Sequence, residues 1–173
     1  MTSFFVASDF SAQAVLNNKA SVLFIDARTR DESGGTFFGQ SAGRNNIAEN
    51  ITVFGFEAFV DNTGNNNTGL GFKAGNNNTT GSCNVFIGSQ AGRENSEETN
   101  NVFIGTNAGL QNTIGRDNIF IGGDSGQNIQ TSSNNLIIGH KNLNFGASLH
   151  SRESIGHCNS LVNNDNVLLG HSI

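Results

Sequence analysis

The stretch NVFIGSQAGREN, from Asn84 to Asn95, is followed by the near copy NVFIGTNAGLQN, from Asn101 to Asn112. A looser copy, NIFIGGDSGQN, begins at Asn118, which keeps the same spacing of 17 residues. A fixed period of this length is typical of repeat architectures, in which each copy forms one structural unit. The period therefore decides the fold class before any single residue does.

The repeat covers most of the chain when the glycine after each apolar run is taken as a marker. The markers are Gly39, Gly55, Gly71, Gly88, Gly105, Gly122, Gly139, Gly156 and Gly170. Their spacing is 16 or 17 residues, except for a last interval of 14. Asparagine stands four residues before six of the markers, at Asn67, Asn84, Asn101, Asn118, Asn135 and Asn166.

Each copy contains a short β-branched and aromatic run bounded by Asn and Gly, which indicates a short strand ending in a turn. One such unit cannot bury its own apolar face, so consecutive units must stack. The sequence predicts an all-β fold: a parallel β-solenoid (β-roll) of about eight coils over residues 36–173. The six asparagines are expected to form a structural ladder, because stacked amide side chains can hydrogen-bond along a column.

Residues 1–35 lack the repeat and are expected to form a separate N-terminal capping or attachment segment. Within them, FFVAS and SVLFIDART are typical of strands, with room for a short helix between.

The residue two before the marker is apolar in seven of the nine copies and forms an apolar column. If the residues on either side of it point into the coil, strand alternation directs this column outward. Such a stripe would be a large exposed apolar patch, and identical chains around a rotation axis would cover it. We therefore predict a homotrimer whose interface includes Phe37, Phe86, Phe103, Phe120, Ile137 and Leu168. The alternative is a flattened two-layer coil that buries the stripe within one chain.

Composition excludes several classes of function. The net charge of −5 gives no basic footprint for nucleic acid, and no apolar run is long enough for membrane insertion. The N-terminus lacks the basic start and cleavage site of a secretory signal. Cys83 and Cys158 fit neither a metal spacing nor a disulfide framework, so both are expected to be reduced thiols.

Little in the sequence points to catalysis. The carboxylates fall mostly in turns, with no two marked as a pair, and neither Trp nor Tyr is present to line a sugar cleft. We expect no enzyme and no cofactor. Three histidines each follow a marker glycine, at His140, His157 and His171, and this column could bind a transition metal. The alternative is an exposed edge of titrating imidazoles.

The repeat N-x-[VFI]-[FI]-G-x-x-A-G-x-x-N resembles the shaft repeats of bacteriophage tail fibres and tailspikes, and is similar to the head repeats of trimeric autotransporter adhesins. The resemblance covers about residues 36–173 and is strongest over 84–127. It implies parallel β-rolls that associate as trimers. Two departures favour a short virion component: no self-cleaving C-terminal chaperone is recognisable, and an autotransporter's signal peptide and membrane anchor are missing.

These observations predict a phage virion structural protein, a short trimeric tailspike or tail fibre that contacts the host cell surface. It would assemble in the host cytoplasm, bind other virion proteins through residues 1–35, and contact a surface glycan or protein. The alternatives are a capsid cement or decoration protein that stabilises the shell, and a trimeric cell-surface adhesin.

Overall fold

The computed structural model describes residues 34–141 continuously, together with short strands on either side of this range. Beyond residue 141, the exposure of a residue is described only at Ile155 and Gly156. The N-terminal strands are β1 (Ser11–Ala12) and β2 (Ala27–Arg28), which pair antiparallel. Strand β1 lies in the segment expected to be helical, so that expectation is wrong at Ser11–Ala12. The other expectations for residues 1–33, including the strand FFVAS, lie outside the described residues apart from β2.

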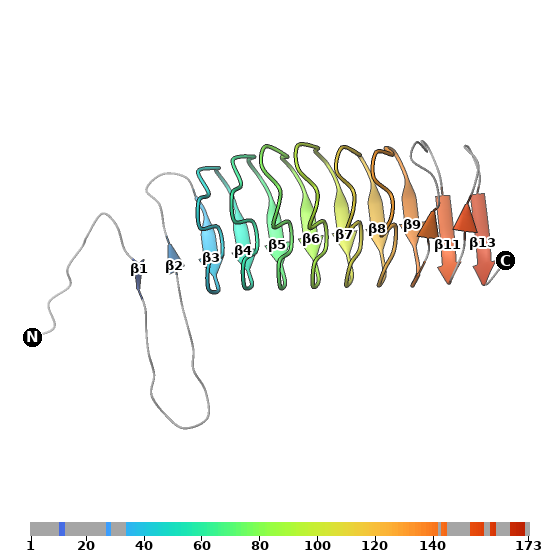
Figure 1. Ribbon diagram of the computed structural model, residues 1–173, viewed down its shortest axis with the longest axis horizontal. Coiled ribbons are helices and arrows are strands. Elements are labelled where there is room, and N and C mark those ends of the chain that lie inside the picture. The colour runs from blue at the N-terminus through green and yellow to red at the C-terminus, as the bar shows by residue number, and fades with distance from the viewer. Residues whose placement is uncertain are drawn as a thin grey trace, which may run out of the picture.

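The chain is an all-β parallel solenoid of about six turns, and its described residues contain no helix. Successive turns lie side by side along a rod, as Figure 1 shows. Each turn contributes one three-residue strand to a common sheet: β3 (Thr36–Phe38), β4 (Thr52–Phe54), β5 (Thr68–Leu70), β6 (Val85–Ile87), β7 (Val102–Ile104), β8 (Ile119–Ile121) and β9 (Leu136–Ile138).

The sheet continues beyond β9 through β11 (Glu153–His157) and β13 (Val167–His171), which gives nine parallel strands. A second small sheet pairs β10 (Leu143–Asn144) with β12 (Ser160–Leu161). The register follows the sequence repeat, so that Val85, Val102 and Ile119 are successive partners. Equivalent residues therefore form columns along the rod.

Glycine is required at the marker column by both conformation and space. Gly105 has a φ of 134°, which L side chains rarely adopt, and a Cβ there would collide with the carbonyl group of Gly122 in the next coil. The residue five before each marker from Gly39 to Gly139 is also left-handed, and Asn, which tolerates this conformation, occupies it at Asn50, Asn66, Asn100 and Asn134.

The core is the apolar column at the middle of each strand. Phe37 is 4% exposed, and Phe86, Phe103, Phe120 and Ile137 are fully buried. Their rings stack along the rod axis, with centroids 5.2 Å apart between Phe86 and Phe103 and 4.8 Å apart between Phe103 and Phe120. Each such pair contributes about 0.5–1.5 kcal/mol beyond the area that it buries.

The predicted outward orientation of this column is therefore wrong. Side chains buried inside one chain cannot form an interface between chains, so these five residues are not trimer contacts. The backbone of Leu168 pairs with Ser154, and its side chain lies outside the described residues. The coil is instead the two-layer arrangement that buries the stripe. The physical reason is that all three positions are apolar in β6–β9, so strand alternation does not by itself decide which side chains point inward. The side chains that point inward are those that pack against the opposite side of the same coil.

Candidate functional site

The outer face of the sheet carries two columns of uncharged side chains, one at each end of the three-residue strands; the first is apolar throughout, and the second is Thr in β3–β5 and apolar in β6–β9. The first column is Phe38, Phe54, Leu70, Ile87, Ile104, Ile121 and Ile138, and the second is Thr36, Thr52, Thr68, Val85, Val102, Ile119 and Leu136. All of these residues are half-buried or exposed, and none is charged. Phe54 is 41% exposed and Ile119 is 39% exposed.

This outer sheet face is long and narrow. Six spacings between the seven strands of these columns give a length of about 29 Å, and two columns of side chains give a width of about 10 Å. The projected area is about 300 Å², the lower end of the range for the largest apolar patch on a monomer, and such patches are often functional. The exposed side chains thus belong to the neighbouring columns and not to the column that the sequence predicted to face outward.

The N-terminal end of this face is aromatic. The rings of Phe38 and Phe54 stack with centroids 4.6 Å apart, and those of Phe56 and Phe72 stack 5.7 Å apart. The ammonium group of Lys73 lies 5.4 Å from the Phe72 ring centroid. Because each ring face is turned toward its neighbour, the rings offer little free face for a sugar to stack on.

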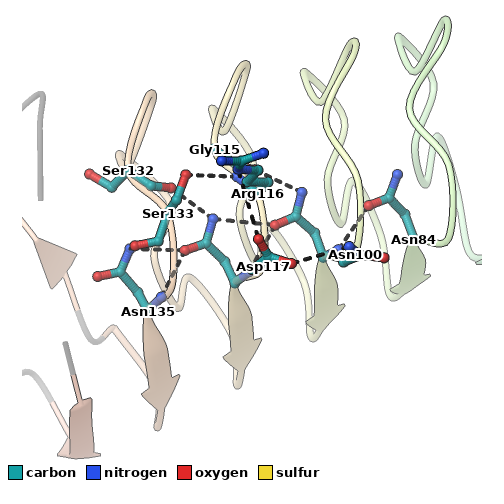
Figure 2. Close-up of polar contacts among 10 residues, drawn as sticks. Asn84, Asn100, Gly115, Arg116, Asp117, Ser132, Ser133 and Asn135 are labelled. Carbon is teal, nitrogen blue, oxygen red and sulfur yellow. Dashed lines mark hydrogen bonds and ion pairs between the residues drawn. The ribbon is translucent and has the colours of Figure 1, made fainter. Parts of the chain in front are cut away.

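Buried asparagines occupy the column in which the sequence predicts a ladder. Asn67, Asn84, Asn101 and Asn118 are fully buried, and Asn135 is 2% exposed. The side-chain oxygens of Asn67, Asn84, Asn101 and Asn118 each accept the backbone N–H of the asparagine in the next coil, at 2.8–3.0 Å. Figure 2 shows this arrangement from Asn84 to Asn135. The ladder thus ties side chains to backbone as well as to one another; Asn166 lies outside the described residues.

The side-chain nitrogens of Asn67, Asn84, Asn101 and Asn118 each donate to a carbonyl of the turn that leads into the next coil, whereas that of Asn135 donates to Ser133. Asn101 donates to Gly115 at 2.8 Å, and Asn118 donates to Ser132 at 2.8 Å. A turn carbonyl buried at this point would otherwise lack a partner. Each asparagine therefore fixes both the spacing of two coils and the turn between them.

Sequence reasoning missed a second buried asparagine column beside the ladder, where Asn67 donates to the side-chain oxygen of Asn62 at 3.1 Å. It consists of Asn46, Asn62, Asn78, Asn95 and Asn112. Asn62 donates to the side-chain oxygen of Asn46 at 2.8 Å and to the carbonyl of Gly64 at 2.8 Å. The final Asn of the motif G-x-x-A-G-x-x-N was the available signal, because it recurs at the same period as the first.

The described carboxylates are engaged in local contacts along the turns. Glu57 lies 3.4 Å from the Lys73 ammonium, and Asp117 accepts a hydrogen bond from Asn100 at 3.2 Å. Among residues whose side chains are described, no group of three or more His, Cys, Asp or Glu is placed to hold a metal ion. Cys83 is an exposed free thiol, and Cys158 lies outside the described residues. Within the described part of the chain, no helix could cross a membrane.

Two of the three histidines singled out by the sequence fall on neighbouring strands. His157 and His171 are direct register partners in β11 and β13. Ile138 pairs with Ile155 at the end of β9, and His140 lies in the turn that follows. Only the His140 side chain is described, and it is exposed.

Comparison with known proteins finds no matching family model, no matching curated protein and no matching solved structure.

Proposed function

We propose that this protein is a structural component of a phage virion, a short homotrimeric spike of about eight coils that contacts the host surface. The proposal combines the resemblance of the repeat to tail-fibre shafts with the rod-like solenoid. The observation that carries it is the uncharged apolar face along the sheet, because such a face needs a covering partner.

A second copy of the chain fits this face better than an unrelated partner. The face repeats at the strand spacing of about 4.8 Å over the whole rod. A partner that matches it rung by rung must have the same rise, which another solenoid of this sequence provides. The number of copies, three around an axis, comes from the resemblance to tail-fibre repeats. The face itself supports only self-association of the chain.

The self-association is tested by light scattering of the purified chain. A chain of 18.3 kDa gives a trimer of about 55 kDa. Ile104→Glu, on the outer sheet face, should dissociate the trimer, because it places a charge in the interface of every copy. Leu110→Glu is the matched control, since Leu110 is a half-buried aliphatic residue of the same coil away from the strand. A wild-type monomer would contradict the proposal.

The exposed turns are the proposed contact surface for the host. The turns NTGNNNTG (62–69) and GRENSEETNN (92–101) present Asn, Thr and Glu side chains, several of them exposed. Three copies on one particle would make weak single contacts effective through avidity. In this proposal residues 1–35 attach the spike to other virion proteins.

Binding of the fluorescently labelled trimer to intact host cells and to empty capsids tests the assignment. Retention on cells, and its loss when the turn residues Glu97, Glu98 and Thr99 are replaced by Ser, would support the spike. Retention on capsids alone would instead support a capsid cement or decoration protein.

A further inference from the structure

Strand β13 lies at the C-terminal end of the sheet, and its far edge pairs with no other described strand. It is the last member of the nine-stranded order and pairs only with β11. At the opposite end of the sheet, the described strand β2 lies against β3, as Figure 1 shows. Among the described strands, therefore, the sheet is covered at one end and open at the other.

The repeat determines which backbone groups of a strand point toward the C-terminal end of the rod. In β7 the N–H of Val102 donates to the carbonyl of Asn118 in the next coil. The carbonyl of Ile104 accepts the N–H of Gly122, which also belongs to the next coil. The first and third residues of β7 thus bond to the coil that follows, because the direction of the backbone groups alternates along a strand.

The equivalent backbone groups face outward in β13. Its register follows the repeat, since Val167 and Leu169 pair with residues of β11 whose own partners lie in β9. Val167, Leu169 and, by alternation, His171 therefore direct their N–H and C=O groups away from β11. The strand VLLGH contains neither proline nor lysine nor an acidic residue, with which natural proteins commonly block a sheet edge.

We propose that β13 pairs antiparallel with β13 of a second copy of the chain, so that two rods join through their C-terminal ends. An antiparallel pair centred on Leu169 places this residue opposite its own copy, and places Val167 opposite His171 of the partner subunit. Every residue whose N–H and C=O groups face outward then belongs to a hydrogen-bonded pair. The strand is complementary to itself because these residues are the first, middle and last of its five.

This contact is separate from the apolar face of the sheet. Its two-fold axis runs perpendicular to the sheet, so the rods lie end to end and their sheet faces stay free to associate side by side. The contact doubles the mass of whatever species the sheet face produces. The mass rises from 18.3 kDa to about 37 kDa for single chains, or from about 55 kDa to about 110 kDa for trimers.

The experiment is light scattering of the full chain at concentrations up to about 1 mM, where the mass should double as the concentration rises. Leu169→Pro removes an outward N–H and should abolish the doubling. Proline is tolerated in an edge strand where the N–H faces away from the sheet, and circular dichroism checks the fold. Val167→Pro, at the first residue of the strand, replaces Leu169→Pro if that variant does not fold. Leu169→Val is the matched control, because it keeps the N–H, and it should still double.

Amide hydrogen exchange of the wild type gives a second readout. Exchange at Val167, Leu169 and His171 should slow by at least about tenfold in the doubled species, because their N–H groups become paired. Unchanged exchange at all three in the doubled species would overturn the proposal.

The light-scattering outcomes separate this contact from the trimer. Absence of doubling in the wild type would overturn the edge contact and leave a trimer through the sheet face untouched. Equal loss of doubling from Leu169→Val and Leu169→Pro would also overturn it, because that result would indicate side-chain contact. Doubling that Ile104→Glu abolishes and Leu169→Pro does not would assign the association to the sheet face and would overturn it as well.

Discussion

The first and second halves of the solenoid differ in the length of their coils and in the residues that fill their cores. From β3 to β5 the register advances by 16 residues per turn, and from β5 to β9 it advances by 17. Thr79 is equivalent to Thr63, and Gly81 is equivalent to Gly64 of the coil before. Thr80 lies between them and is therefore the residue that lengthens the first 17-residue coil. It lies exposed in a turn, and the backbone N–H groups of Thr79, Thr80 and Gly81 all donate to the carbonyl of Ser96.

The cores of the two halves differ more than their turns. In the second half the central strand position holds Phe86, Phe103 and Phe120 in an unbroken stack. In the first half it holds Val53 and Gly69, and the missing ring comes from Phe59, which stacks on Phe86 with centroids 5.6 Å apart. Phe59 occupies a turn position that is glycine at Gly43, Gly75, Gly92, Gly109 and Gly126, and it adopts a φ of 45°. The ring next to Phe86 in the stack is therefore supplied by a turn residue, Phe59, in place of the strand residue at position 69.

The largest loss of stability is expected from Phe103→Ala, which breaks the regular stack at its centre. Removing a fully buried phenylalanine costs about 3–5 kcal/mol, because a cavity remains between two rings. Val53→Ala in the first half is the comparison and should cost about half as much, since fewer buried methyl groups are lost. Urea unfolding of the two variants and the wild type measures both losses of free energy. Equal losses for Phe103→Ala and Val53→Ala would contradict the expected difference between the two cores.

A smaller loss is expected from Phe59→Gly. The lost ring contact is partly offset by relief of the left-handed backbone, which costs a bulky residue about 1–2 kcal/mol, so the net loss should be about 2–3 kcal/mol. Gly69→Phe alone should also destabilise, because a Cβ on Gly69 would lie 2.5 Å from the Phe59 ring.

Together, Phe59→Gly and Gly69→Phe convert the first half to the pattern of the second. The double variant should return to within about 1 kcal/mol of the wild type, through a favourable coupling between the two sites. Simple additivity of the two losses would show that the exchange is not compensatory.

The asparagine ladder gives a third contrast, because the first half places Ile51 where the second has asparagine. Asn101→Ile should cost about 1–3 kcal/mol, since the Asn118 N–H and the Gly115 carbonyl both lose a buried partner. Ile51→Asn should cost less, because the introduced side-chain oxygen can accept the Asn67 N–H. Thermal unfolding of both variants measures the two losses of stability, and a larger loss for Ile51→Asn than for Asn101→Ile would contradict the prediction.

The smallest effect is expected from deletion of Thr80, which shortens the first 17-residue coil to 16. The residue is exposed in a turn, so the loss should be below about 1 kcal/mol. Deletion of Ala74, a buried residue of the same coil, is the control and should prevent folding by shifting every later inward side chain. A melting curve of each deletion variant is sufficient.

Much of the candidate site could be placed from the sequence, but its orientation could not. The period located the asparagine ladder from Asn67 to Asn135, because stacking in register converts sequence equivalence into spatial neighbours. The outward column was wrongly assigned, since strand alternation has two solutions and Val-Phe-Ile is apolar at all three positions. A usable signal was present: the position before the phenylalanine column is Thr36, Thr52 and Thr68 in the first three strands, which favours solvent on that face.

The sequence alone determined the coil length, the strand positions and the parallel register, because each depends on a residue pattern that recurs at a fixed spacing. It also determined where glycine must stand, since the turn conformation excludes side chains at Gly105 and its equivalents. Only the tertiary structure decided which face of each strand lies inside and that Phe59 replaces the ring missing at Gly69. Both depend on the shape of the space between opposite walls of a coil, and that shape exists only after the coils have stacked.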